Sequence, residues 1–146
     1  MVGTNTGKGG LTVNEGAYSA ICAQINSGFE IQKLVQYIGW KPDKMVRSGD
    51  VYLVHCPIHQ DSVFRTLVLN PRNNTYHCKH VNCAGNRPSD FLDLLVKVFN
   101  KSLPEVIHDV VTHFGPEYFR LSTKQVAIIG ELVKVAREQR LIEKPA

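Results

Sequence analysis

Three cysteines and one histidine form two close pairs in the middle of the chain. Two residues separate Cys56 from His59, eighteen residues follow, and four residues separate Cys78 from Cys83. Two pairs of soft or borderline donors joined by a loop of this length allow a hairpin to fold back around one tetrahedral ion. The spacing therefore predicts that Cys56, His59, Cys78 and Cys83 bind Zn²⁺.

The predicted zinc has a structural role, because four protein ligands leave no coordination position open for water. The enzymatic alternative is a zinc deaminase, which needs a glutamate two residues after its ligand histidine to carry protons. Neither His55 nor His59 has one, and Pro57 and Asp61 stand at those positions instead. The nearby histidines that could compete as the fourth ligand are His55, His77 and His80.

The composition fits a single globular domain in a reducing compartment. The chain has 146 residues, of which 43% are hydrophobic, as in ordinary compact domains. No apolar run approaches the roughly 20 residues that span a bilayer, and residues 1–10 lack an apolar signal core. We therefore expect a cytoplasmic protein without a membrane partner, in which reduced thiols are available to bind metal.

Positive charge is concentrated in the segment that carries the predicted ligands. Residues 41–87 contain seven Lys and Arg against three Asp, whereas the rest of the chain holds ten basic and ten acidic residues. Three thiolates and a neutral imidazole around Zn²⁺ lower this local excess without cancelling it. The distribution indicates a polyanionic partner, although an ordinary solvated basic surface would show the same excess.

Basic and aromatic residues alternate through the same segment, a mixture that suits single-stranded nucleic acid. Cations follow the phosphates while aromatic faces stack on bases, and each full stack contributes roughly 1–3 kcal/mol. The predicted contacts are Lys41, Lys44, Arg47, Tyr52, Arg65, Arg72, Tyr76, Lys79 and Arg87. Ordinary packing is the alternative for Tyr52 and Tyr76. Phe64 is expected in the core, on the strand face opposite Arg65.

Helices are predicted on both sides of a short antiparallel sheet. Apolar residues at helical spacing predict five helices, at residues 14–25, 27–40, 91–99, 102–115 and 122–142. Runs of β-branched and aromatic residues predict three strands, at residues 51–55, 64–69 and 75–78. The predicted fold class is therefore α+β, with a small antiparallel zinc-ribbon sheet flanked by helices.

Capping boxes predict where three of these helices begin, because a serine and an acidic or amide side chain three residues later cap each other's backbone N–H. The three pairs are Ser27 with Glu30, Ser102 with Glu105, and Ser122 with Gln125. The predicted organisation is a flexible tail at residues 1–13, a zinc-ribbon domain with flanking helices at 14–116, and a helical extension at 117–146. Cys22 is predicted to be a small buried residue of the first helix.

Residues 29–115 resemble the zinc-binding domain of bacterial-type DNA primases, the Cys-His-Cys-Cys primase zinc-finger family. The resemblance rests on Cys-Pro-Ile-His at 56–59, Tyr-His-Cys at 76–78, Cys-Ala-Gly-Asn at 83–86, the turn at Pro71 and the neighbouring helices. The family usually has two residues between the last two cysteines, where this chain has four.

The resemblance implies a zinc ribbon that grips single-stranded template DNA, while a separate acidic domain polymerises the primer. It implies the zinc-ligand role for Cys56, His59, Cys78 and Cys83. It makes candidate DNA contacts of Lys41, Arg47, Arg65, Lys79 and Arg87. No Asp-x-Asp pair occurs in the chain to hold paired magnesium ions, so we do not expect the chain to make primers by itself.

We therefore expect a DNA-recognition module of primase-type replication, with a primase catalytic subunit or a helicase as its protein partner. The alternative is a zinc-stabilised protein-interaction module without nucleic-acid binding. A third possibility is that the chain is a fragment or relic of a full primase. The alternative would dock through an apolar face of the last helix, formed by Val126, Ile129, Val133 and Ala136. Basic residues interleaved with glutamates on that helix are expected to be solvated, namely Lys134, Arg137 and Arg140.

Overall fold

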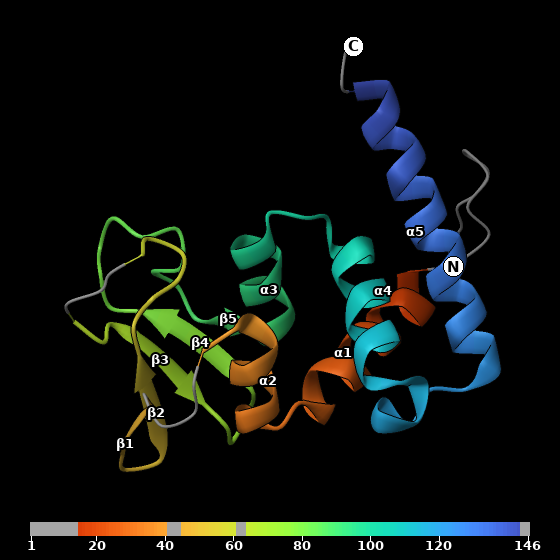
Figure 1. Ribbon diagram of the computed structural model, residues 1–146. Coiled ribbons are helices and arrows are strands. Elements are labelled where there is room, and N and C mark those ends of the chain that lie inside the picture. The colour runs from red at the N-terminus through yellow and green to blue at the C-terminus, as the bar shows by residue number, and fades with distance from the viewer. Residues whose placement is uncertain (1–14, 41–44, 61–63, 144–146) are drawn as a thin grey trace. The chain divides into compact units, whose positions relative to one another are not determined.

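A computed structural model of the chain describes residues 15–40, 45–60 and 64–143 (Figure 1). The chain divides into two compact units. Unit 1 combines the residues up to Ile25 with those from Ser102 onward, and unit 2 is Asn26–Lys101. The predicted tail and two predicted DNA contacts, Lys41 and Lys44, lie outside the described residues.

Unit 2 contains one antiparallel sheet whose strands follow the order of the chain. The strands are β1 (Val46–Ser48), β2 (Val51–Val54), β3 (Leu67–Asn70), β4 (Thr75–Cys78) and β5 (Ser89–Asp90). The three predicted strands form the middle of this sheet, and two short strands that were not predicted lie at its edges (Figure 1). Together with the helices, this sheet confirms the α+β class.

The two faces of the sheet differ in burial. Tyr52 pairs with Leu69, and Leu69 pairs with Tyr76, so all three side chains lie on one face. Leu69 and Tyr76 are buried there, whereas Leu53 and Val68, a pair on the opposite face, are half-buried. The core of unit 2 therefore lies against the first of these faces.

The expectation that Phe64 belongs to this core is wrong. The strand predicted at residues 64–69 begins only at Leu67. Phe64 lies outside the strand, so the alternation of side chains between the two sheet faces does not apply to it. Its side chain is 67% exposed.

Helices α2 (Ile31–Ile38) and α3 (Phe91–Phe99) complete the core of unit 2. Asp90 caps α3, because its side chain accepts a hydrogen bond from the Asp93 N–H. The capping box predicted for α2 is wrong: its N-cap is Glu30, which makes no capping hydrogen bond through its side chain. The buried side chains of the two helices are Ile31, Leu34, Val35, Phe91, Leu92, Leu94 and Leu95.

Unit 1 is helical. It consists of most of α1 (Glu15–Gly28), then α4 (Leu103–Phe114), the short 3-10 helix η2 (Pro116–Phe119) and α5 (Thr123–Glu143). The capping boxes at Ser102 and Ser122 are both confirmed by reciprocal hydrogen bonds. No helix in the described part of the chain is both long enough and apolar enough to cross a membrane.

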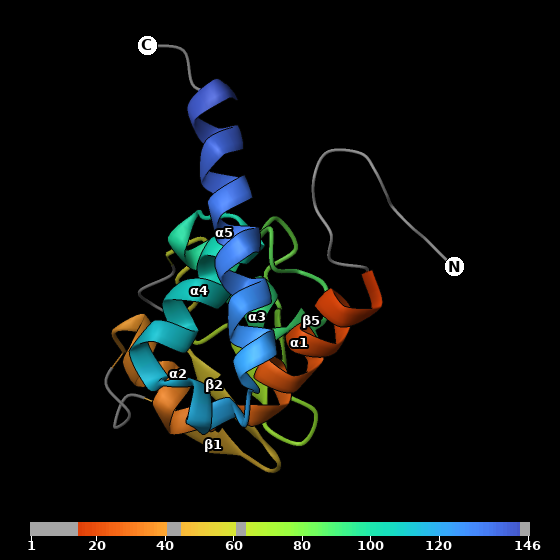
Figure 2. The ribbon, with the colours of Figure 1, turned by 90° about the vertical axis from the view of Figure 1, so that its right-hand side faces the viewer.

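The apolar face of α5 is used inside unit 1. Ile129 and Val133, two members of the predicted docking face, are only 3% and 4% exposed. Helices α4 and α5 pack side by side in both views (Figures 1 and 2). Two of the four residues that the protein-interaction alternative would use for docking are therefore buried inside unit 1, and the other two, Val126 and Ala136, are half-buried.

Candidate metal centre

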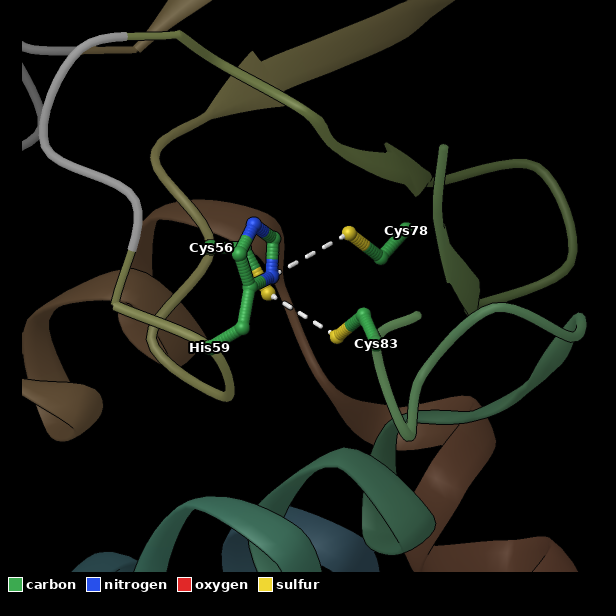
Figure 3. Close-up of side chains that lie close together, drawn as sticks. All are labelled: Cys56, His59, Cys78 and Cys83. Carbon is green, nitrogen blue, oxygen red and sulfur yellow. Dashed lines mark hydrogen bonds between the residues drawn. The ribbon is translucent and has the colours of Figure 1, made fainter. Parts of the chain in front are cut away.

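Four side chains converge at one end of the sheet of unit 2 (Figure 3). The possible ligand atoms of Cys56, His59, Cys78 and Cys83 all lie within 4.8 Å of one another. The Cys56 and Cys83 sulfurs are 3.7 Å apart, and the Cys78 sulfur lies 3.6 Å from His59 Nδ1. Two sulfurs about 2.3 Å from one tetrahedral ion would be about 3.8 Å apart, so this group can hold a metal ion.

The sheet register brings the two pairs together. Val54, Leu67 and Cys78 form one row across β2, β3 and β4, so the end of β2 lies at the same end of the sheet as the end of β4. Cys56 follows the end of β2, and Cys78 is the last residue of β4. Strand pairing thus places side by side two pairs that are far apart in sequence.

Backbone N–H groups point at the sulfurs. The His80 N–H donates to the Cys78 sulfur and the Gly85 N–H donates to the Cys83 sulfur, each at 3.4 Å. Such bonds favour a negatively charged sulfur. The turn that follows each cysteine of the second pair therefore directs an N–H group toward its sulfur.

Burial works against the thiolate of Cys56 when no cation is bound. Removal from water raises the pKa of Cys56 to about 12, although backbone N–H groups of His59 and Ile58 favour the charged form. A bound cation offsets this cost, because its charge compensates the thiolate and a metal-bound thiol loses its proton. A bound metal ion would therefore stabilise the thiolate form of this donor set.

Gly85, part of the Cys-Ala-Gly-Asn motif, lies close to Ile58 and Tyr76. A Cβ atom at this position would lie 2.8 Å from Ile58 Cδ1 and 3.1 Å from the Tyr76 ring. The Gly85 carbonyl accepts a hydrogen bond from the Cys78 N–H at 2.8 Å. A larger residue would therefore require the Ile58 side chain to move and the Tyr76 ring to shift slightly.

The three competing histidines are not part of the group. His55 Nδ1 lies 3.0 Å from the Phe64 carbonyl, and His77 alternates with Cys78 along β4, so it lies on the other sheet face. His80 is exposed, and its Nδ1 accepts a hydrogen bond from the Asn82 N–H. Its ring does stack at a tilt on the His59 ring, with centroids 4.6 Å apart.

The described basic residues among the predicted DNA contacts are all exposed. They are Arg47, Arg65, Arg72, Lys79 and Arg87. Arg72 lies 3.5 Å from Asp50 in an exposed ion pair, and the Arg47 guanidinium lies 5.9 Å from the centre of the half-buried Tyr52 ring. Unit 2 therefore presents these cations on its surface, together with the half-buried ring of Tyr52 and the exposed ring of Phe64.

Tyr76 does not belong to this surface, and its prediction as a DNA contact is corrected. Its side chain is 1% exposed, so its ring cannot stack on a base. The hydroxyl donates to Asp93 Oδ2 at 2.5 Å and accepts from Lys97 Nζ at 3.0 Å. Burial, followed by the bond to Asp93, raises the pKa of Tyr76 well above its usual value. The ring thus anchors β4 to α3.

No known protein family, curated protein or solved structure matches the chain. The resemblance to primase zinc-binding domains therefore rests on the motif residues of this sequence alone. What the structure adds to those residues is a group of three thiols and one imidazole that can hold a metal ion, in a unit with an exposed basic surface.

Proposed function

We propose that this chain is a zinc-binding module that recognises single-stranded DNA in primase-type replication, without a polymerising domain of its own. The observation that carries the proposal is the convergence of Cys56, His59, Cys78 and Cys83 at the end of a small sheet. These are the residues on which the resemblance to primase zinc-binding domains rests. A cytoplasmic location and a primase catalytic subunit or helicase as partner belong to the same proposal.

Zinc is the ion that this donor set favours. Three thiolates and one imidazole in tetrahedral geometry are typical of structural zinc sites, in which every coordination position is taken by protein. All four cysteines of the chain are free thiols. The ion would hold the ends of β2 and β4 together and leave the chemistry of primer synthesis to a partner.

The charge of the surface supports a nucleic-acid partner. The five described cations predicted as DNA contacts are exposed on unit 2, and among the described residues of β1 to β4 and their turns the only acidic one is Asp50. Cations of this kind bind phosphates and release counterions. An accessible aromatic ring, Tyr52, favours a single strand over a duplex, because only unpaired bases can stack on a side chain.

The test is a titration of the zinc-loaded protein with a fluorescent single-stranded DNA at several salt concentrations. We expect salt-sensitive binding. Arg65→Ala and Arg87→Ala should weaken it and reduce the slope of log K against log salt by about 0.7 for each phosphate that the variant no longer neutralises. Lys134→Ala, an exposed lysine of α5 in unit 1, is the matched control and should bind like the wild type. No binding at low salt would reject the proposal and favour a protein-interaction module.

A further inference from the structure

A groove lies between α2 and the sheet of unit 2. Its volume is about 490 Å³, within the roughly 300–1,000 Å³ range of small-molecule sites. Tyr52 of β2 and Pro71, just after β3, line one side, and polar side chains from α2 line the other. The groove therefore has a tyrosine ring and a proline on one side and hydrogen-bonding side chains on the other.

The wall carries amide and charged groups. Gln32 and Gln36 are exposed and one helical turn apart, so they share a face of α2. Each amide offers both donors and an acceptor, the pattern that the polar edge of a base requires; glutamine pairs with adenine through two such bonds. Glu30 adds an acceptor and Lys33 adds a cation.

Tyr52 is placed to hold a planar group. Arg47 is its partner across β1 and β2, and the guanidinium lies 5.9 Å from the ring centre. A planar group lying on the ring would have the positive charges of Arg47 and Lys33 beside it. That arrangement suits a base that remains attached to its phosphate, because stacking and charge pairing can be made together.

We infer that this groove receives one unstacked base of the bound strand, with the face of the base on Tyr52 and its polar edge against Gln32 and Gln36, an assignment that rests on the proposed function. An apolar peptide side chain would leave the amides and charges of α2 without partners, which costs free energy when they are desolvated. A base satisfies them. The groove thus gives the module a contact with base identity, in addition to its contacts with phosphates.

The experiment compares a single-stranded oligodeoxyadenylate with an abasic oligomer of the same length, which keeps the phosphates and lacks the bases. The wild type should bind the intact strand about tenfold more tightly, which corresponds to one stacked base. Tyr52→Leu should lose most of this difference, with unchanged affinity for the abasic strand. Tyr52→Phe keeps the ring and should retain the difference, and Gln36→Leu should reduce the preference for adenine over thymine strands.

Phe64→Leu is the matched control, because Phe64 is an exposed aromatic residue that does not line the groove. It should retain the preference for the intact strand. Metal content and the urea unfolding midpoint are measured for each variant to check that Tyr52→Leu is folded. Gln36→Leu, an exposed change on α2, provides a second readout that does not disturb the sheet.

The possible failures are distinguishable. Equal binding of intact and abasic strands by the wild type would overturn the base site. The same conclusion would follow if Phe64→Leu, but not Tyr52→Leu, lost the affinity difference between the two strands. In both cases the proposed function stands. Free deoxyadenosine monophosphate could instead bind in a way that depends on Tyr52 while strand binding does not depend on Tyr52. That result would replace the proposed base site with a mononucleotide site. Absence of binding to either strand at low salt would reject both proposals.

Discussion

Asn26 and Asn74 hold each other through reciprocal hydrogen bonds. Asn26 Nδ2 donates to the Asn74 carbonyl at 3.0 Å, and Asn74 Nδ2 donates to the Asn26 carbonyl at 2.8 Å. Asn26 Oδ1 also accepts from the Phe91 and Leu92 N–H groups, and Asn74 Nδ2 also donates to the Phe29 carbonyl. One pair of side chains thus joins the end of α1, the turn between β3 and β4 and the start of α3.

Removing the Asn26 amide should destabilise unit 2 strongly. Asn26→Ala leaves the first N–H groups of α3 and the Asn74 carbonyl without these partners, and buried groups left unsatisfied cost about 1–3 kcal/mol each. We expect a loss of about 2–4 kcal/mol in the free energy of unfolding, measured by urea denaturation of the zinc-loaded protein. Asn73→Ala, at an exposed position of the same turn, should change stability by less than about 1 kcal/mol.

Loss of one sulfur ligand should abolish metal binding and unfold unit 2. Cys78→Ser replaces a fully buried candidate ligand, and the binding free energy of a structural ion is folding free energy. After gel filtration, the wild type should carry one zinc ion per chain and Cys78→Ser none, with reduced circular dichroism. Cys22→Ser is the control because Cys22 lies in α1, outside the ligand group. A full zinc equivalent in Cys78→Ser would contradict the site.

His59 and His80 should behave differently although their rings are in contact. His59→Ala should lower metal affinity by more than about 100-fold, because even residues that only support a ligand contribute 10–100-fold. His80→Ala should leave the affinity unchanged. Co²⁺ titration provides the measurement, since the visible bands of tetrahedral cobalt report the ligand set. An intact spectrum in His59→Ala together with an altered one in His80→Ala would assign the fourth ligand to His80.

The bonds around Asp93 should make stability depend on acid pH. Burial disfavours the charged carboxylate, but Lys97 and Tyr76 outweigh it and hold the pKa of Asp93 below its ordinary 3.8. Because the pKa of Asp93 is lower in the folded than in the unfolded protein, its carboxylate stabilises the fold at pH values above the unfolded-state pKa. This stabilisation is lost as the pH falls through the folded-state pKa. Asp93→Asn should therefore cost about 1–3 kcal/mol at neutral pH, and the cost should shrink below pH 3.8.

The measured quantity for Asp93 is the difference in unfolding free energy between wild type and Asp93→Asn at each pH, because loss of metal in acid affects both proteins. Tyr76→Phe keeps the carboxylate and its ion pair with Lys97, so it should retain most of the pH dependence. A difference between wild type and Asp93→Asn that stays constant from pH 7 to pH 3 would show that the charge of Asp93 does not contribute to stability.

Features that depend on neighbours in sequence were predictable. The two pairs of the candidate metal group followed from residue types and spacing. The three central strands followed from β-branched runs, and the starts of α4 and α5 from the serines at 102 and 122 with their partners three residues later. Each of these rests on contacts within a few residues, so a local pattern contains the physical cause. The α+β class followed from their sum.

Exposure and partner choice were decided only by tertiary structure. Tyr76 is buried because α3 meets β4, Phe64 is exposed because β3 begins after it, and the apolar face of α5 is covered because α4 packs on it. The structure also brings His59, the histidine predicted from its spacing, and not the competitor His80, into the group with the cysteines. Whether a side chain meets water or protein depends on segments far away in sequence, which no local pattern of residues contains.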